Sequence, residues 1–202
     1  MKEVKAILLL GPTGAGKTPL GREIEKNGFM GKKAFHFDFG ENLRKIVSNK
    51  FPFPKKEKLL IEKILKEGRL LFEEEFYLAE QILSLFLESK NYQKSDWLVL
   101  NGLPRNLFQA IQLEHWIDIK YTVFLNCNSE ILKIRLCLDP AGDRKERVDD
   151  LDELVAYKLD WFKRETLPLC EFYKNKATFI SIDVLATDTG EDLYYKLKHL
   201  MD

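Results

Sequence analysis

The chain has 202 residues, which is enough for one domain of ordinary size, and no low-complexity stretch or long linker divides it. Its 32 lysine and arginine residues balance its 32 aspartate and glutamate residues, so no overall charge draws it to nucleic acid or to an anionic membrane. No apolar run approaches the ~20 residues of a membrane span, and the apolar run near the N-terminus is too short for a signal peptide. We therefore expect a cytoplasmic, monomeric protein with no nucleic-acid or membrane partner.

Short β-rich runs alternate with longer segments of helical periodicity, which is typical of a parallel sheet wrapped by helices. Strands are predicted at 5–10, 34–37, 97–100, 121–125 and 178–182. Helices are predicted at 16–27, 41–50, 55–66, 73–89, 106–116, 129–138, 151–165 and 191–200. Gly28 and Gly68 are placed to end two of these helices. The predicted fold class is α/β, with a five-stranded parallel sheet between two layers of helices.

The most informative motif occupies residues 11–18. It reads GPTGAGKT directly after the apolar run AILLL, which matches the phosphate-binding loop pattern G-x-x-x-x-G-K-[ST] in its expected context of strand, loop and helix. The glycines allow successive N–H groups to surround a phosphate, and the following helix directs its positive dipole end at the anion. Lys17 adds a positive charge for the β and γ oxygens, and Thr18 offers a hydroxyl to Mg²⁺. The motif predicts a P-loop NTPase fold that binds ATP, with Mg²⁺ as cofactor.

Two segments stand apart from the predicted core of this single domain. The helices at 39–89, between the second and third strands, are longer than an ordinary crossover, and we expect them to form a mobile flap over a second ligand. The turn-forming, charged segment at 139–147 lies between two helices and is too short for a folded lid of its own. The core is assigned to residues 1–38, 90–138 and 148–202.

Glycine and arginine residues follow two of the predicted strands. The third strand ends in NGLPR at 101–105, and the second is followed by FGENLR at 39–44. Ligands of open α/β sheets bind at the carboxyl ends of the strands. Arg44 and Arg105 are therefore expected to face one crevice.

These segments give the chain a resemblance to the adenylate kinase family of nucleoside monophosphate kinases, in its short-lid branch. Residues 101–105 with Gln109 are similar to the family's DGFPR-x-x-x-Q motif, residues 39–44 to its TGDLLR motif, and RVDD at 147–150 to its R-x-DD motif. The motifs keep the family's order and spacing from the phosphate loop nearly to the C-terminus. The resemblance implies phosphoryl transfer from ATP to a nucleoside monophosphate (NMP). Such transfer depends on positioning and charge neutralisation and needs no general base from the protein.

The resemblance also implies roles for individual residues. It implies catalytic roles for Lys17, Arg105, Arg147 and Lys158. It implies ATP binding by Gly11, Thr13, Gly14, Ala15, Gly16, Lys17, Thr18, Pro19, Arg135 and Arg144. It implies NMP binding by Phe39, Gly40, Arg44, Leu71, Gly102, Arg105 and Gln109. It implies that the metal is held by Thr18, with the ATP phosphates, and through water by Asn101.

By the same resemblance, Arg44 and Arg105 clamp the acceptor phosphate with planar guanidinium groups. Arg135 lies over the donor base, and Arg147 closes onto the transferring phosphoryl group. Gln109 indicates adenine as the acceptor base, because an amide donates to a ring nitrogen and accepts from the exocyclic amine.

The segment at 139–147 has two interpretations. As a lid, its closure would exclude water from the transfer. The alternative is a plain surface turn. Asp149 and Asp150 either orient lid arginines or cap the helix that follows them.

Four residues depart from the family's pattern. Asn101 replaces an aspartate, which removes the carboxylate expected to hold hydrated Mg²⁺, although Thr18 supplies a hydroxyl where the family commonly has glycine. Pro19 replaces a threonine and has no N–H for the α-phosphate. Lys158 replaces an arginine and exchanges a fork of donors for a point charge. Phe39 replaces a threonine in the acceptor-base pocket, where a ring stacks on a base but makes no hydroxyl hydrogen bond.

The leading hypothesis is an adenylate kinase, which converts ATP and AMP into two ADP. One alternative is a P-loop kinase for CMP, UMP or another small acceptor. Another is a nucleotide-binding regulator with little turnover, which the departures at Asn101, Pro19 and Lys158 favour. Asp38 is a further candidate contact to the acceptor because it ends a strand beside Gly40, and His36 is interpreted as a structural strand residue.

Overall fold

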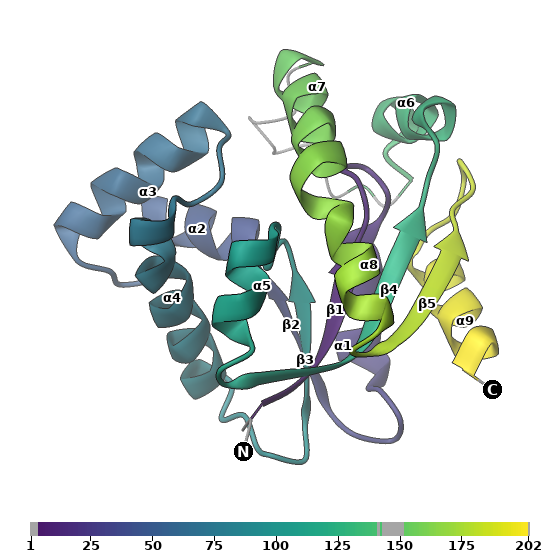
Figure 1. Cartoon of the computed structure of the whole chain (residues 1–202), viewed down its shortest axis with the longest axis horizontal. Coiled ribbons are helices and arrows are strands. Elements are labelled where there is room, and N and C mark those ends of the chain that lie inside the picture. The colour runs from purple at the N-terminus through teal and green to yellow at the C-terminus, as the bar shows by residue number, and fades with distance from the viewer. Residues whose placement is uncertain (1–3, 141, 143–151, 202) are drawn as a thin grey trace.

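A computed structural model describes residues 4–140, 142 and 152–201. Its centre is one sheet of five parallel strands in the order β2-β3-β1-β4-β5, with helices on both faces (Figure 1). The strands are β1 (Val4–Leu10), β2 (Ala34–Asp38), β3 (Trp97–Asn101), β4 (Ile117–Asn126) and β5 (Thr178–Asp183). The predicted α/β fold with a five-stranded parallel sheet is confirmed.

Helices alternate with the strands along the chain. Their bounds are α1 (Lys17–Asn27), α2 (Phe39–Val47), α3 (Lys55–Glu67), the 3₁₀ helix η1 (Glu73–Glu75), α4 (Phe76–Ser89), α5 (Leu107–Leu113), α6 (Ser129–Leu138), α7 (Asp152–Trp161), the π-helical segment η2 (Phe162–Thr166), α8 (Pro168–Lys174) and α9 (Gly190–Met201). As predicted, Gly28 and Gly68 are the C-caps of α1 and α3, and both have positive φ. None of the helices in the described ranges has the length and apolar character that a membrane span requires.

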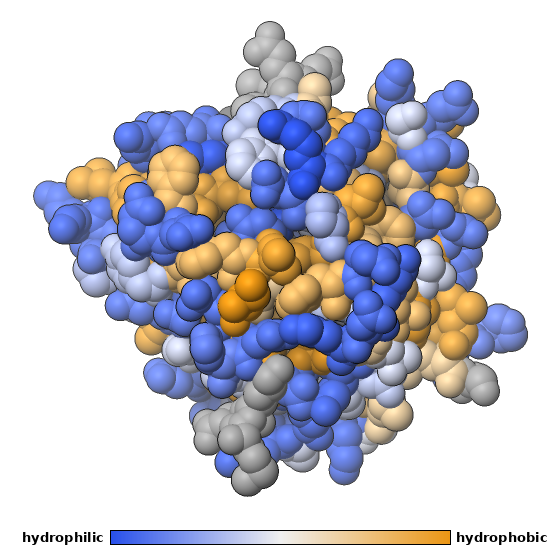
Figure 2. All heavy atoms as spheres, in the orientation of Figure 1, coloured by the Kyte–Doolittle hydropathy of each residue, from blue (hydrophilic) through white to orange (hydrophobic). Residues whose placement is uncertain are grey.

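Alternation along β1 divides the core between the two faces of the sheet. Ala6, Leu8 and Leu10 belong to a buried cluster with residues of α2, α3, α4, α5 and α8. Ile7 and Leu9 belong to a second cluster with residues of α1, α6 and α9. Both faces of the central strand are therefore covered by helices, which is why β1 is a continuous apolar run. Figure 2 shows hydrophilic residues over much of one side of the molecule, with hydrophobic residues gathered mainly near its middle.

The start of β4 differs from the sequence prediction. β4 begins at Ile117, where it pairs with Val4 of β1, and not at residue 121. Asp118 and Lys120 alternate with apolar residues here, so this part of the strand has the alternating pattern of a half-buried strand and lacks the mostly apolar run of the part from Tyr121 onward.

The helix α8 was missed by the sequence prediction, which ended the preceding helix at residue 165. In the structure η2 follows α7, and α8 begins after Leu167 with Pro168 as its first residue. A proline inside a helical pattern predicts an end, but in a first turn it has no intrahelical hydrogen bond to lose.

The segment between β2 and β3 consists of α2, α3, η1 and α4, and we call it the insertion. Arg69 stabilises the turn between α3 and α4 by donating to both carboxylate oxygens of Glu75, at 2.6 and 2.8 Å. Its guanidinium also lies 4.1 Å from the centre of the Phe72 ring. The hydrogen bonds from Arg69 hold the pKa of Glu75 below its ordinary value. That the insertion moves as a flap stays a prediction.

The predicted lid lies mostly outside the described residues. Asp139 ends α6 in a left-handed conformation, and Pro140 and Gly142 are the other lid positions that the structure describes. Arg144, Arg147, Asp149 and Asp150, to which the sequence prediction assigned roles, lie outside the described ranges.

We predict that Gly190→Ala destabilises the protein, because α9 begins against α1 at this glycine. A Cβ atom at Gly190 would lie 2.8 to 2.9 Å from atoms of Pro19, two of them in the backbone. We expect the free energy of unfolding, measured by urea denaturation, to fall by about 1–3 kcal/mol. The exposed Ser84→Ala on α4 is the control and should change it by less than about 0.5 kcal/mol. Alanine is intrinsically the better helix residue, so equal or higher stability of Gly190→Ala would contradict this packing.

Candidate functional site

The phosphate loop, residues 11–18, connects β1 to α1 at the carboxyl edge of the sheet. Gly14 and Gly16 have φ of 86° and 101°, a region that favours glycine. A Cβ atom at Gly16, the N-cap of α1, would lie 2.7 Å from Leu193 Cδ1 and 3.0 Å from a terminal nitrogen of Arg135. The loop therefore needs glycine here both for its backbone conformation and for its close packing.

Lys17, the first residue of α1, lies over this loop. Its ammonium group donates to the carbonyl oxygens of Gly11 and Pro12, both at 2.7 Å. These two contacts hold a positive charge at the N-terminus of α1, where the helix dipole also favours an anion.

One cavity brings together most of the residues that the sequence prediction assigned to the site. It is lined by Gly11, Thr13, Gly14, Gly16, Lys17, Thr18, Pro19, Phe39, Gly40, Arg44, Leu71, Asn101, Gly102, Arg105, Gln109, Arg135 and Lys158. Ala15 is fully buried under the loop and does not line the cavity. The cavity thus joins the phosphate loop to the two arginines at the ends of neighbouring strands.

Arg105 follows β3 and is fixed through its backbone. Its N–H donates to Oε1 of Gln109 at 2.8 Å, and its carbonyl oxygen accepts from the hydroxyl of Thr166 in η2 at 2.7 Å. The guanidinium lies over Gly102, whose φ is 80° and where a Cβ atom would be 3.7 Å from an Arg105 terminal nitrogen. Gln109, which the sequence assigned to the acceptor base, is thus also a positioning residue for Arg105. Its amide nitrogen is not used in this contact.

Arg44 lies in the second turn of α2 and is positioned by the start of that helix. Asp38 caps α2, because its Oδ1 accepts from the backbone N–H of Glu41 at 2.9 Å. A Cβ atom at Gly40 would lie 3.4 Å from a terminal nitrogen of Arg44, so the guanidinium lies close over this glycine. A Cβ atom at Gly40 would therefore contact the guanidinium directly.

A buried polar cluster lies beneath the loop at the ends of β2 and β3. Oδ2 of Asp38 accepts from the hydroxyl of Thr18 at 2.7 Å and from the amide of Asn101 at 2.9 Å. The same amide nitrogen lies 3.0 Å from Thr18 Oγ1 and 3.4 Å from Nε2 of His36. Thr18, Asp38 and Asn101 line the cavity.

The two titratable members of this cluster have shifted pKa values in different ways. Burial lowers the pKa of His36, so its ring is neutral at pH 7. Burial by itself would raise the pKa of Asp38, but the hydrogen bonds from Thr18 and Glu41 outweigh it and hold the pKa below its ordinary value. The cluster therefore carries one negative charge, on Asp38.

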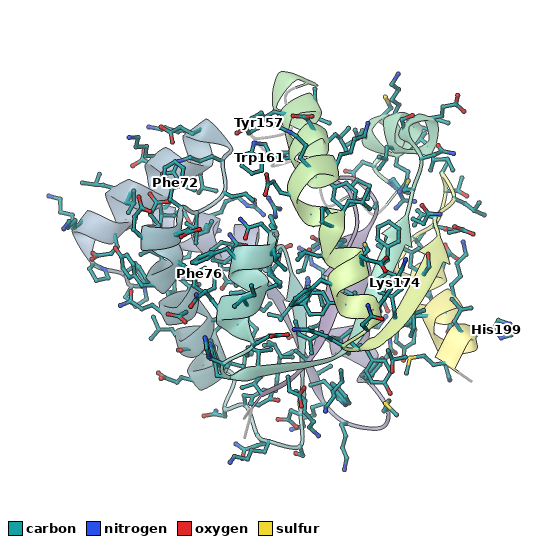
Figure 3. The ribbon with its side chains drawn as sticks, in the orientation of Figure 1. Phe72, Phe76, Tyr157, Trp161, Lys174 and His199 are labelled. Atoms are coloured by element: carbon teal, nitrogen blue, oxygen red, sulfur yellow. The ribbon has the colours of Figure 1, made fainter. Side chains whose placement is uncertain are left out.

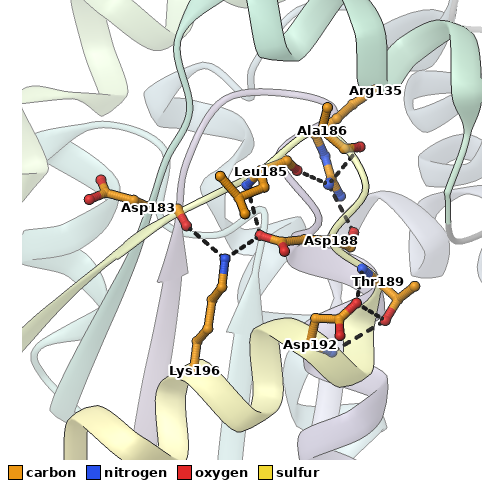
Figure 4. Close-up of polar contacts among 8 residues, drawn as sticks. All are labelled: Arg135, Asp183, Leu185, Ala186, Asp188, Thr189, Asp192 and Lys196. Carbon is orange, nitrogen blue, oxygen red and sulfur yellow. Dashed lines mark hydrogen bonds and ion pairs between the residues drawn. The ribbon is translucent and has the colours of Figure 1, made fainter.

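Arg135 has a different environment from the one that the sequence prediction gave it. The residue is 2% exposed, and its guanidinium donates to the carbonyl oxygen of Gly14 at 3.0 Å. It also donates to the carbonyl oxygens of Leu185, Ala186 and Asp188 at 2.7 to 3.5 Å (Figure 4). These contacts tie the phosphate loop to the segment that follows β5. Contact between Arg135 and a donor base stays a prediction.

The helix α7 and the segment η2 complete the cavity on the side opposite the insertion. Lys158, Trp161 and Phe162 line it there. In Figure 3, Trp161 and Tyr157 lie on the side of α7 that is nearer to the insertion, on which Phe72 is labelled. No motif marked Trp161 and Phe162, because their place at the cavity depends on how α7 packs.

The insertion contributes an apolar part of the cavity wall, beside Arg44 and Arg69. Phe39, Leu43 and Ile64 lie on α2 and α3, and Leu70 and Leu71 follow α3. Of these five residues, only Phe39 and Leu71 were predicted to lie at the site. The others are core-type leucine and isoleucine residues, which sequence patterns do not distinguish from ordinary buried residues.

A central parallel strand followed by a glycine-rich loop, with lysine and threonine opening the next helix, is the phosphate-binding arrangement of the P-loop NTPases. Comparisons with known proteins narrow this class. A family model described as an AAA domain matches residues 7–155. The chain is 30% identical over 204 residues to an adenylate kinase of Rickettsia bellii, covering 88% of this chain and 90% of that relative. It is 29% identical over 208 residues to an adenylate kinase of Pelagibacter ubique, covering 88% and 91%.

The chain therefore belongs to the adenylate kinase family, and it also matches the family described as an AAA domain. Among solved structures, a gluconokinase of Sinorhizobium meliloti has a TM-score of 0.52 at 14% identity, over 99% of this chain and 95% of that one. At this identity the likeness shows a shared fold.

We predict that Arg135→Ala lowers the free energy of unfolding by about 3–5 kcal/mol, because buried carbonyl oxygens lose charged donors. Urea denaturation of the ligand-free protein measures this change. Lys133→Ala, an exposed position on the same helix, is the control and should be nearly neutral. If Arg135→Ala retains full stability but loses ATP affinity, its main task is nucleotide contact and not support of the loop.

Proposed function

We propose that the protein is a short-lid nucleoside monophosphate kinase that converts ATP and AMP reversibly into two ADP, acting as a monomer. The observation that carries the proposal is that the phosphate loop and two arginines, Arg44 and Arg105, line the same cavity. Phosphoryl transfer needs donor and acceptor phosphates held in line with their negative charge neutralised, and this arrangement supplies both requirements.

On the donor side, the N–H groups of the phosphate loop and the Lys17 ammonium would hold the β and γ phosphates of ATP. The hydroxyl of Thr18 and the carboxylate of Asp38 beside it are oxygen ligands, and oxygen ligands suit a hard cation such as Mg²⁺. Bound with ATP, Mg²⁺ would neutralise part of the negative charge on the β and γ phosphates. Thr18 would contact it directly and Asn101 through water.

On the acceptor side, the guanidinium groups of Arg44 and Arg105 would grip the phosphate of the monophosphate with paired hydrogen bonds. The apolar wall would take the base, with Phe39 in contact with its ring. The amide of Gln109 favours adenine, because it offers a donor beside an acceptor.

Lys158 supplies a further positive charge to the cavity from α7. In the proposed reaction it contacts the transferring phosphoryl group together with Arg147, and Arg144 contributes to ATP binding. As a point charge, it would orient this group less strictly than the arginine that the family pattern has at this place.

A coupled assay for ADP formation over AMP, GMP, CMP, UMP and a sugar acid tests the proposal. We expect AMP to give the highest kcat/KM. Activity with a pyrimidine monophosphate or a sugar acid, but not with AMP, would assign the chain to the small-acceptor alternative. Tight ATP binding without turnover on any acceptor, in the natural chain and in Asn101→Asp, would favour a nucleotide-binding regulator.

We predict that Arg44→Ala and Arg105→Ala each lower kcat/KM for the monophosphate by roughly 10²–10³-fold, because a charged donor to the acceptor phosphate is lost. ATP affinity, measured by calorimetry without acceptor, should stay within about threefold of the natural value, a difference of less than about 1 kcal/mol. Arg22→Ala, exposed on α1, is the control for loss of an arginine and should leave both quantities unchanged. An unaltered kcat/KM in both site variants would contradict the proposed acceptor site.

A further inference from the structure

Asp38 divides its two carboxylate oxygens between two tasks. Oδ1 accepts from the Glu41 N–H and caps α2. Oδ2 is not needed for the cap and instead accepts from Thr18, at 2.7 Å, and from Asn101, at 2.9 Å. The residue is 8% exposed, and it lines the cavity next to the phosphate loop. The helix cap uses only Oδ1 and does not explain the contacts that Oδ2 makes with Thr18 and Asn101.

The position of Asp38 relative to Asn101 is set by the sheet. The two residues are register partners on β2 and β3, so they lie opposite each other at the same level of the carboxyl edge. Neighbouring strands are only ~4.8 Å apart, and either position therefore places a short side chain within reach of the Thr18 hydroxyl. The carboxylate that the family pattern would have at position 101 is present in this chain on the adjacent strand.

The residue types at these two positions also depend on each other electrostatically. An aspartate at position 101 would face the Asp38 carboxylate at hydrogen-bond distance, and two like charges in a buried site oppose each other's ionisation. The amide of Asn101 instead donates to Asp38, so the pair holds a single negative charge. A cation at Thr18 would meet one carboxylate, as the family pattern requires.

On this basis, and resting on the proposed kinase function, we propose that Asp38 replaces the missing β3 aspartate as the residue that positions magnesium on ATP. The ionised Oδ2 holds the proton of Thr18, which leaves a lone pair of the hydroxyl oxygen for the cation. It also offers an acceptor for a water ligand of the cation. Asp38 acts through Thr18 and water and is a positioning residue.

The structure supplies a matched control for this proposal. Asp183 and Asn126 are also register partners at the carboxyl ends of adjacent strands, β5 and β4. They are joined by the same type of hydrogen bond, from the Asn126 amide to Asp183 Oδ1 at 2.7 Å. This pair is exposed and does not line the cavity. Asp183→Asn therefore removes an equivalent carboxylate away from Thr18.

The test compares ATP affinity by calorimetry in saturating Mg²⁺ and in EDTA, without any acceptor, for the natural chain, Asp38→Asn, Asp183→Asn and the exchange variant Asp38→Asn/Asn101→Asp. The ratio of the two affinities measures the coupling between metal and nucleotide. We expect Asp38→Asn to reduce this ratio roughly 10-fold to 100-fold, as loss of an outer-shell partner does. ATP affinity in EDTA should be equal or higher. The exchange variant should recover the ratio, and Asp183→Asn should not alter it.

Each of the following outcomes supports or overturns the proposed role of Asp38. An unchanged ratio in Asp38→Asn overturns the proposal, and so does an equal loss of affinity with and without metal, which would indicate a structural role. If Asp38→Asn does not fold, the exchange variant decides: a natural ratio supports the proposal, and a lost ratio with intact ATP binding in EDTA overturns it. Failure of the natural chain to bind ATP would instead contradict the proposed function itself.

Discussion

The site depends on close backbone packing at the carboxyl edge of the sheet, around the end of β1. Because β1 is the central strand, the phosphate loop that follows it lies between the ends of β3 and β4. A Cβ atom at Gly11 would lie 3.0 Å from the carbonyl oxygen of Leu125 in β4, and one at Gly16 would contact α9. The loop is therefore held by its neighbours, and its N–H groups are oriented before any phosphate arrives, which is the preorganisation that electrostatic catalysis needs.

Cationic side chains hold the same region together through backbone carbonyl oxygens. Lys17 donates to two carbonyl groups of the loop itself, and Arg135 joins Gly14 to the segment after β5. Charged donors satisfy buried carbonyl groups strongly, and the charge remains near the place where an anion would bind. One set of contacts thus contributes to both stability and electrostatic potential, and through them Arg135 supports the loop.

Residues that depart from the family pattern lie in both halves of the cavity, and they differ in what they change. On the donor side, Asn101 and Asp38 form a hydrogen-bonded pair across adjacent strands, so the loss of one carboxylate coincides with the presence of another. On the acceptor side, Phe39 enlarges the apolar wall and brings no hydroxyl. In the proposed function, the first change keeps one carboxylate beside Thr18, and the second would affect which acceptor is chosen.

The sequence alone determined the strands, most of the helices and the phosphate loop, because these features depend on local apolar patterns and on glycines whose backbone conformation has few substitutes. It also indicated that Arg44 and Arg105 belong to one site, because both follow strand ends. Only the tertiary structure decided the partners of these groups. Strand order made Asp38 a neighbour of Asn101 and Thr18, the packing of η2 brought Thr166 to Arg105, and the segment after β5 surrounded Arg135. Such contacts join residues 20 to 83 positions apart in the chain, and no local pattern encodes them.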